Sequence, residues 1–338
     1  MRIAVIGAGS WGTAVSGLLS NNGHDVSLWA REPEIAESVN TQHRNPIYLK
    51  DVVLAESVRA TADLGEAVED ASAVVIVTPT FGVRGIGEGL SSVLGSDVPV
   101  VSLAKGLERD SLLRMTEVLE QTLGNRSRLA ALSGPNHAEE VSKGVPSATV
   151  IAAYDDAIAS RFQQIFFSPM FRAYTNPDVI GVELGGATKN VIALAAGAAD
   201  AYGLGDNTKA ALLTRGLAEM SRLGRAMGAQ PITFMGLAGM GDLIATALSR
   251  HSRNRLLGEM IAKGKTLEDF TRETNMVAEG ATAAIAVDEL GQKMGVDLPI
   301  THVCRRVLYD GASITEALDY LVGRDATDEI HSMGLEEE

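Results

Sequence analysis

The first half of the chain alternates short apolar segments with amphipathic segments of helical length. Six apolar segments read "RIAVI", "DVSLWA", "SAVVIVTP", "VPVVSLA", "RLAALSG" and "SATVIAA". Their hydrophobicity is nearly continuous, which is typical of strands that are buried on both faces of a parallel sheet. Stretches of helical length, such as residues 11–20 and 112–123, lie between them. The pattern predicts an α/β fold with a doubly wound, mostly parallel sheet.

The pattern changes after "NPDVIGVELGG", which ends at Gly186. Beyond it lie long runs rich in Ala, Leu, Met and Gly that lack the turn residues expected between strands, so the second half should be all-helical. A chain of 338 residues is also longer than one core usually grows. We therefore expect an α/β domain over residues 1–180 and an all-helical domain over residues 181–334.

Composition excludes several classes of protein. The formal net charge of -14 argues against a nucleic-acid-binding protein, which needs a broad basic face. The single cysteine, Cys304, excludes an internal disulfide and is expected to be a buried structural thiol. The six histidines have no metal-ligand spacing, so no metal site is predicted. No signal peptide is visible, and no unbroken apolar run reaches the roughly 18 residues of a membrane span, so we expect a cytoplasmic protein.

A glycine-rich turn follows the first predicted strand directly. In "GAGSWGTA", Gly7, Gly9 and Gly12 complete the pattern G-x-G-x-x-G at the start of a predicted helix. In a dinucleotide-binding turn, the first glycine allows the turn, the second lets a pyrophosphate approach the backbone, and the third lets the helix pack on the strand. The alternative is a glycine turn that binds nothing.

The end of the second predicted strand carries residues suited to either nicotinamide cofactor. Arg31 comes directly after the strand, and Glu32 follows it. An arginine at this position accommodates the 2′-phosphate of NADP, whereas a carboxylate holds the 2′-hydroxyl of NAD. The position of Arg31 favours NADP. A solvated Arg31, with Glu32 binding the ribose of NAD, stays open as the alternative.

Positive charge gathers in one short segment of this acidic chain, "SRHSRNR", which ends at Arg255. A predicted helix starts there, so Ser252 is a candidate N-cap and the backbone donors near it form a small anion site. Arg253 adds a planar guanidinium suited to phosphate, and Asn254 adds a neutral donor. Arg250 and Arg255 are expected to face solvent or to pair with acidic neighbours. The alternative is a solvated basic turn that balances local carboxylates.

Five stretches occur in one order along the chain: "GAGSWGTA", "SLAKGLE", "LSGPNHAEE", "GATKNVIALAAG" and "GLAGMGDLIAT", the last followed by "SRHSRN". Over nearly the whole chain they resemble the bacterial-type NAD(P)-dependent sn-glycerol-3-phosphate dehydrogenase family. The resemblance implies a Rossmann domain, an all-α domain like that of 6-phosphogluconate dehydrogenase, and an active site in the cleft between them. It also implies a homodimer.

The implied reaction is reversible hydride transfer between NAD(P)H and dihydroxyacetone phosphate, which gives sn-glycerol 3-phosphate for glycerophospholipid synthesis. A related dehydrogenase of a β-hydroxy acid or sugar acid is the alternative with the same fold. A non-catalytic NADPH-sensing protein is the alternative from another class.

The resemblance also implies roles for individual residues. The implied cofactor contacts, besides the three glycines, are Ser10, Trp11, Arg31, Tyr48, Lys105, Ala138, Arg253, Val277 and Glu279. The implied substrate contacts are Lys105, Gly134, Asn136, Lys189, Asp242, Ser252, Arg253 and Asn254. Lys189 matches the proton donor and acceptor, and Lys105 and Asp242 complete the catalytic set. Two departures stand out: "GPNHA" replaces "GPSFA", where Asn136 can still form hydrogen bonds, and "AREPE" lacks a second basic residue, which weakens the NADP assignment.

The residue types fit this chemistry. Reducing a ketone needs a proton donor or a cation near the oxygen, and a lysine can serve as both. Lys189 lies in an uncharged, small-residue segment, although a lysine that extends to solvent is the alternative. Burial and a nearby Lys105 would lower its pKa, whereas Asp242 would raise it.

Three further candidates carry structural alternatives. Lys105 follows a predicted strand, where ligands of parallel sheets bind, and its alternative is a solvated loop lysine. Asp242 precedes an apolar helical run, so it is also a candidate N-cap, and the two roles can coexist. Glu279 has the alternative of an ordinary acidic residue in a helix's first turn.

Overall fold

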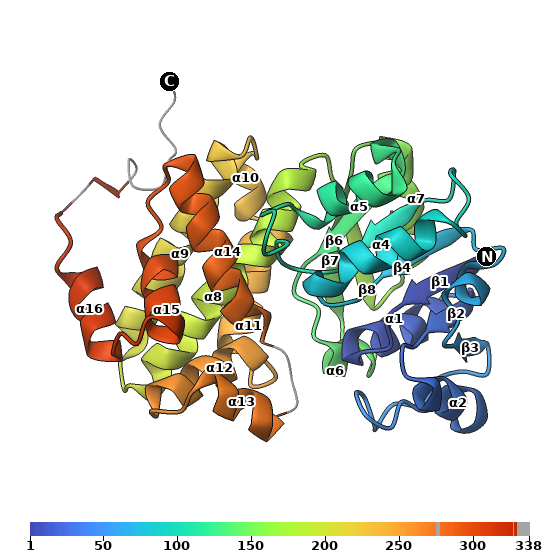
Figure 1. Ribbon diagram of the computed structural model, residues 1–338, viewed down its shortest axis with the longest axis horizontal. Helices are drawn as coiled ribbons and strands as arrows, with labels where there is room; N and C mark the ends of the chain where they lie inside the picture. The colour runs from blue at the N-terminus through green and yellow to red at the C-terminus, as the bar shows by residue number, and fades with distance from the viewer. Residues whose placement is uncertain (275–277, 327, 330–338) are drawn as a thin grey trace. The chain divides into compact units, whose positions relative to one another are not determined.

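The computed structural model describes residues 1–274, 278–326 and 328–329. The chain divides into two units. The first comprises Met1–Lys105 and Arg114–Val179, and the second comprises Gly106–Leu113 and the chain from Ile180 onward. Figure 1 colours the first unit from blue to green and the helices of the second mostly from yellow-green to red. The segment Gly106–Leu113 belongs to the second unit because Leu107 and Leu112 pack in its core.

The first unit is built on one eight-stranded sheet with the order β3-β2-β1-β4-β5-β6-β7-β8. The strands are β1 (Arg2–Ile6), β2 (Asp25–Trp29), β3 (Val58–Thr61), β4 (Ala73–Ile76), β5 (Val100–Ser102), β6 (Leu129–Ser133), β7 (Ser147–Ala153) and β8 (Phe171–Asn176). Strands β1 to β6 are parallel, β7 is antiparallel to β6, and β8 is parallel to β7. The predicted fold class is therefore confirmed.

All six predicted strands are present, and two strands were missed. Their residues are only partly apolar: "VRAT" in β3 and "FRAYTN" in β8 alternate buried and exposed positions. Both lie at the edges of the sheet, where a strand has one neighbour and one covered face. An edge strand does not need the continuous hydrophobicity that identified the other six.

Helices flank this sheet. They are α1 (Ser10–Asn21), α2 (Pro33–Gln42), α3 (Leu64–Val68), α4 (Val83–Ser91), α5 (Met115–Leu123), α6 (Ala138–Val141) and α7 (Asp156–Phe166). Apolar residues of α1 and α7, such as Val15 and Phe162, share one core with Ile3 and Val5 of β1. Helix α4 lies beside α5 and also contacts α3 (Figure 1). The loop between β1 and α1 lies where the sheet order reverses, because β2 and β4 flank β1, and ligands of such sheets bind at this point.

The described part of the second unit contains helices and no strand, as predicted. They are α8 (Val179–Ala201), α9 (Asp206–Ala226), α10 (Pro231–Phe234), α11 (Asp242–Leu248), α12 (Arg253–Ala262), α13 (Leu267–Thr274), α14 (Glu279–Met294), α15 (Pro299–Tyr309) and α16 (Ile314–Val322). Residues 181–190 of α8 are all buried, so α8 is the central helix of this unit. A helix that is apolar on all sides belongs in a core, and it carries no amphipathic stripe in its sequence.

Two helical stretches have the length and hydropathy of a membrane span. They are Val179–Ala201, whose most apolar window is 89% buried, and Pro231–Leu248, whose window is 44% buried. Such helices are weak evidence of a membrane span, because a helix that is mostly buried in a protein core passes the same test of length and composition.

Candidate functional site

The glycine turn after β1 is shaped by close backbone contacts. Gly7 has a φ of +119°, and a Cβ there would lie 2.9 Å from the carbonyl oxygen of Val77. A Cβ on Gly12 would lie 1.8 Å from the carbonyl oxygen of Gly7, so only glycine lets α1 pack on the turn. Gly9 is the N-cap residue of α1, and a Cβ on it would meet nothing within 4 Å. The start of α1 therefore has room for an anion in front of its backbone N–H groups.

Several implied cofactor residues gather around this start. Ser10 Oγ donates to the carbonyl oxygen of Tyr48 at 2.7 Å. Trp11 packs in a small apolar cluster that includes Ala138, the first residue of α6. Ser10, Trp11, Tyr48 and Ala138 thus lie on segments that surround the glycine turn.

Sequence reasoning missed one residue here, Asn45. Its buried amide donates to the carbonyl oxygen of Ala8 at 2.7 Å and to Thr13 Oγ1 at 2.8 Å. Its Oδ1 accepts from the backbone N–H groups of Ile47 and Tyr48. Asn45 therefore ties the segment that carries Tyr48 to the glycine turn. An asparagine before a proline indicates only a turn, so the sequence contains no clear signal for this role.

The two residues that follow β2 bind each other. Arg31 Nη2 lies 2.7 Å from Glu32 Oε1, and Nε of the same guanidinium lies 3.1 Å from that oxygen. The hydrogen bond with Glu32 raises the pKa of Arg31 above its ordinary value. The Arg31 side chain is 73% exposed, and such surface pairs contribute about 0 to 1 kcal/mol. Either residue can therefore leave the other for a cofactor at little cost.

A second group lies beyond the carboxyl ends of β5 and β6. Lys105 Nζ donates to the carbonyl oxygen of Gly134 at 2.8 Å. Gly134 follows β6 with a φ of +152°, and a Cβ there would lie 3.0 Å from Thr149 Cα. Asn136 Nδ2 donates to the carbonyl oxygen of Ala148 at 2.9 Å. Lys105, Gly134 and Asn136 are thus brought together, and Lys105 is half-buried rather than a freely solvated loop residue.

In the second unit, Lys189 lies in the middle of α8, and its side chain is buried. Nζ is 2.9 Å from Asp242 Oδ1 and 2.6 Å from Thr246 Oγ1. Thr246 Oγ1 in turn lies 3.2 Å from Asp242 Oδ1. The Lys189 side chain is only 7% exposed and that of Asp242 3%, so the alternative of a lysine that extends to solvent is wrong.

Asp242 is not a helix N-cap. A π-helical turn, Leu237–Gly241, runs directly into α11, so Asp242 lies inside a continuous helical segment. Its carboxylate binds Lys189 and Thr246 instead. Thr246 was missed by sequence reasoning, although it lies four residues after Asp242, and residues with this spacing share one face of a helix.

The basic segment forms the start of α12. Ser252 is its N-cap, and the buried Oγ accepts from the N–H of Arg255 at 3.2 Å, as predicted. Arg253 is exposed, as is Arg250. Arg253 and Asn254 are the first two residues of α12, so their backbone N–H groups have no acceptor within the helix. These two N–H groups lie on the same helical turn as the Arg253 guanidinium, and donors of this kind suit an anion.

Arg255 does not belong to this anion site. It pairs with Asp200 at 3.0 Å and with Glu259 at 2.7 Å, as expected from the sequence. The backbones of α12 and α8 also touch, because a Cβ on Gly258 would lie 1.9 Å from the carbonyl oxygen of Leu194. A Cβ on Gly197 of α8 would likewise lie 2.0 Å from the carbonyl oxygen of Arg255, so the first turn of α12 packs on the helix that carries Lys189.

The Asn254 side chain is engaged within the protein. Its Nδ2 donates to Asn190 Oδ1 at 2.8 Å, and its Oδ1 accepts from the backbone N–H of Gly280 at 2.9 Å. Glu279 is the first residue of α14 and is partly buried. Val277 lies outside the described residues.

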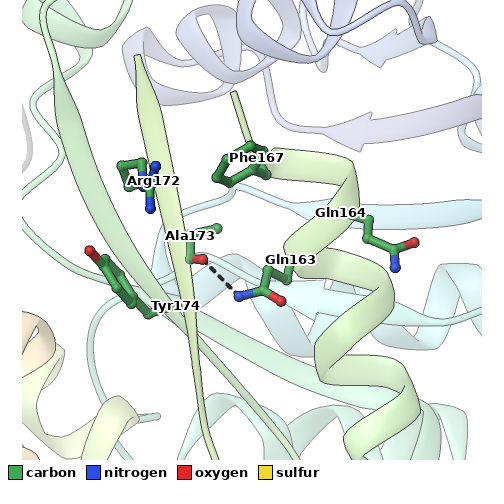
Figure 2. Close-up of a pocket in the computed structure, with 6 residues that line it drawn as sticks. All are labelled: Gln163, Gln164, Phe167, Arg172, Ala173 and Tyr174. Atoms are coloured by element: carbon green, nitrogen blue, oxygen red, sulfur yellow. Dashed lines mark hydrogen bonds between the residues drawn. The ribbon is translucent and has the colours of Figure 1, made fainter. Parts of the chain in front are cut away.

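A hollow of about 420 Å³ lies elsewhere in the first unit, between α7 and β8 (Figure 2). Gln163 Nε2 donates there to the carbonyl oxygen of Ala173 on the edge strand, at 2.9 Å. The Arg172 guanidinium lies 5.3 Å from the centre of the Phe167 ring. None of the residues that line the hollow is a predicted site residue. Among the residues that the structure describes, no group of His, Cys, Asp or Glu is placed to hold a metal ion.

Comparison with known proteins gives one consistent family. Residues 2–159 match the model of the NAD-dependent glycerol-3-phosphate dehydrogenase N-terminus, and residues 178–319 match that of the C-terminus. The chain is 47% identical to glycerol-3-phosphate dehydrogenase [NAD(P)+] of Moorella thermoacetica, over 98% of both chains. It is 43% identical to that of Fusobacterium nucleatum, over 98% of this chain and 99% of the relative. The crystal structure of glycerol-3-phosphate dehydrogenase from Coxiella burnetii is similar, with a TM-score of 0.92 and 32% identity over 96% of this chain and 99% of that one.

Proposed function

The chain belongs to the NAD-dependent glycerol-3-phosphate dehydrogenase family, and from this premise we propose how its residues perform the reaction. It is an oxidoreductase that reduces dihydroxyacetone phosphate reversibly to sn-glycerol 3-phosphate with NAD(P)H. The relatives do not favour a β-hydroxy acid or sugar acid dehydrogenase, nor a non-catalytic NADPH-sensing protein.

The cofactor binds at the start of α1. The open space beside Gly9 and the unobstructed N–H groups there fit a pyrophosphate. Ser10, Trp11, Tyr48 and Ala138 surround it, and Arg31 binds the 2′-phosphate when the cofactor is NADP. When bound, the nicotinamide supplies or accepts the hydride. Lys105, Arg253, Val277 and Glu279 complete the proposed set of cofactor contacts.

Lys189 moves the proton. As a hydride reaches the carbonyl carbon, negative charge grows on the oxygen, and Nζ of Lys189 donates a proton to it. In the reverse direction Nζ accepts that proton. Asp242 and Thr246 hold Nζ in place through contacts of 2.9 and 2.6 Å, and the Asp242 carboxylate balances the charge of the ammonium. This buried group on the central helix is the observation that carries the proposal.

The substrate phosphate binds at the start of α12. The backbone N–H groups of Arg253 and Asn254 and the guanidinium of Arg253 supply its donors. Ser252 shapes this start as the N-cap, and the backbone contact between Gly197 and Arg255 holds it on the helix of Lys189. Lys105, Gly134 and Asn136 are proposed to contact the substrate from the first unit.

The wider context is also part of the proposal. Residues 1–180, apart from the segment Gly106–Leu113 that packs in the second unit, form the cofactor-binding domain, and residues 181–334 form the substrate-binding domain. The enzyme acts in the cytoplasm, as a homodimer, and its product feeds glycerophospholipid synthesis. The membership of the family supports these statements.

The substitution Arg253→Ala tests the phosphate site. Losing one side of a desolvated charge pair costs about 2 to 5 kcal/mol, or roughly a 30-fold to several-thousand-fold loss in kcat/KM for dihydroxyacetone phosphate. Unphosphorylated dihydroxyacetone should be affected much less, and Arg250→Ala is the matched control. Equal losses on both substrates would show that Arg253 does not bind the phosphate. Wild-type protein that consumes no NADPH or NADH with dihydroxyacetone phosphate would overturn the function itself.

A further inference from the structure

Three helices of the second unit meet at one side-chain amide. Asn254 is the second residue of α12, and it is 8% exposed. It donates to the side chain of Asn190 on α8 and accepts from the backbone N–H of Gly280 on α14. The amino group and the oxygen of this amide therefore each bind another helix.

The contact with α14 replaces a missing cap. The first N–H groups of a helix have no partner within the helix, and a side chain at the N-cap position usually accepts from one of them. The N-cap residue of α14 is Ala278, which has no side-chain oxygen, and Asn254 accepts from Gly280 instead. A Cβ on Gly280 would lie 2.6 Å from the carbonyl oxygen of Asn190, so only glycine allows α14 to approach this closely.

We propose that the Asn254 side chain is a positioning residue, which fixes the start of α14, and with it Glu279, against the helix that carries Lys189. The side chain does not bind the substrate phosphate. The part of Asn254 that serves the phosphate is its backbone N–H, which any residue except proline supplies at this position. This inference rests on the proposed function, because that function assigns Glu279 to the cofactor and the start of α12 to the phosphate.

The substitution Asn254→Ala separates these two roles. It keeps the backbone N–H and removes the amide, which leaves the N–H of Gly280 and Oδ1 of Asn190 without this partner. Losing buried hydrogen bonds of this kind should weaken NADPH binding by about 5- to 30-fold, because the first turn of α14 is no longer held. The values of kcat/KM for dihydroxyacetone phosphate and for dihydroxyacetone should fall by the same factor.

Two measurements do not depend on turnover. NADPH binding is measured by the fluorescence of the reduced nicotinamide, and inorganic phosphate binding is measured by calorimetry. Asn254→Ala should weaken the binding of NADPH and leave the affinity for phosphate close to that of the wild type. The matched control is the neighbouring Arg253→Ala, which should weaken the binding of phosphate strongly. If Asn254→Ala instead weakens phosphate as Arg253→Ala does, or leaves NADPH binding unchanged, the inference is overturned.

A second variant covers the case in which Asn254→Ala does not fold. In Asn254→Ser, the hydroxyl is too short to reach both Asn190 and Gly280, and serine is well tolerated in the first turn of a helix. It should show the same pattern, with a smaller loss of NADPH affinity. Wild-type protein that binds NADPH but does not reduce dihydroxyacetone phosphate would refute the proposed function, while the binding measurements on the variants would still decide the role of Asn254.

Discussion

Asp242→Asn is the sharpest test of the buried lysine. The substitution keeps the shape of the side chain and removes the charge that lies 2.9 Å from Lys189 Nζ. Both side chains are almost fully buried, so the substitution takes the charge of a carboxylate away from a buried ammonium, which keeps its contact with Thr246. Removing one partner of a buried ion pair typically costs about 3 to 5 kcal/mol of the free energy of unfolding. We expect a loss of that size in the second unit.

The chain offers a way to assign this loss to one unit. Its two tryptophans, Trp11 and Trp29, both lie in the first unit. Tryptophan fluorescence during urea unfolding therefore reports on the sheet, whereas circular dichroism at 222 nm is weighted toward the helical second unit. The urea midpoint seen by circular dichroism should fall strongly in Asp242→Asn, while the fluorescence midpoint should change less.

Two controls complete this test. Asp319→Asn removes an exposed carboxylate from the same unit and should change the free energy of unfolding by less than about 0.5 kcal/mol. The double variant Lys189→Met/Asp242→Leu removes both charges and should recover most of the lost stability without recovering activity. A loss below about 1 kcal/mol in Asp242→Asn would refute the reasoning that a buried cation depends on this carboxylate.

Three further predictions concern single groups. Burial raises the pKa of Glu219 from 4.5 to about 7. Between these pH values the native state keeps a proton that the unfolded chain has lost, so the wild type becomes less stable as pH rises. Relative to Glu219→Gln, the wild type should lose up to about 3 kcal/mol of unfolding free energy over this range. The free energy of unfolding is measured with urea at each pH, and the same pH dependence in both proteins would contradict the raised pKa of Glu219. Burial raises the pKa of the Cys304 thiol to about 12, so a thiol reagent should label it only as the protein unfolds, and rapid labelling of native protein would exclude a buried thiol. Glu32→Gln should raise the ratio of kcat/KM for NADPH to that for NADH by up to about fivefold, because it releases Arg31 from its ion pair and removes a negative charge next to the guanidinium. Arg31→Ala should lower kcat/KM for NADPH far more than for NADH. Equal effects on both cofactors would show that Arg31 does not discriminate between them.

The sequence predicted those parts of the fold that hydrophobic periodicity reports directly. The six predicted strands were found because their hydrophobicity is nearly continuous. Strands β3 and β8 were missed because an edge strand keeps polar residues on its exposed positions. The helical nature of the second half was predicted from composition, whereas its packing was not, since α8 is buried on all sides and its sequence has no amphipathic stripe that marks one buried face.

The sequence predicted the candidate site most directly where its residues lie together in one short motif. The glycine turn and the Ser252 cap are local features, so their neighbours in the chain reveal them. The contacts of Thr246 with Lys189 and of Asn45 with Ala8 join segments far apart along the chain, and the spacing of four residues between Asp242 and Thr246 is the one local signal that was available. Asp242 looked like a cap because an apolar run follows it, and the π-helical turn before it has no sequence signature.

The central claim is that Lys189 supplies the proton for reduction of dihydroxyacetone phosphate. The most direct test is kcat of Lys189→Ala with saturating NADPH and dihydroxyacetone phosphate, together with the dissociation constant for NADPH. Removal of a general acid typically costs about 10² to 10⁴ in rate, and the larger loss is expected if the ammonium also stabilises the growing alkoxide. The account predicts this loss with NADPH affinity nearly unchanged. A variant that folds and retains half of the wild-type kcat would contradict the account and would make Lys105 the next candidate.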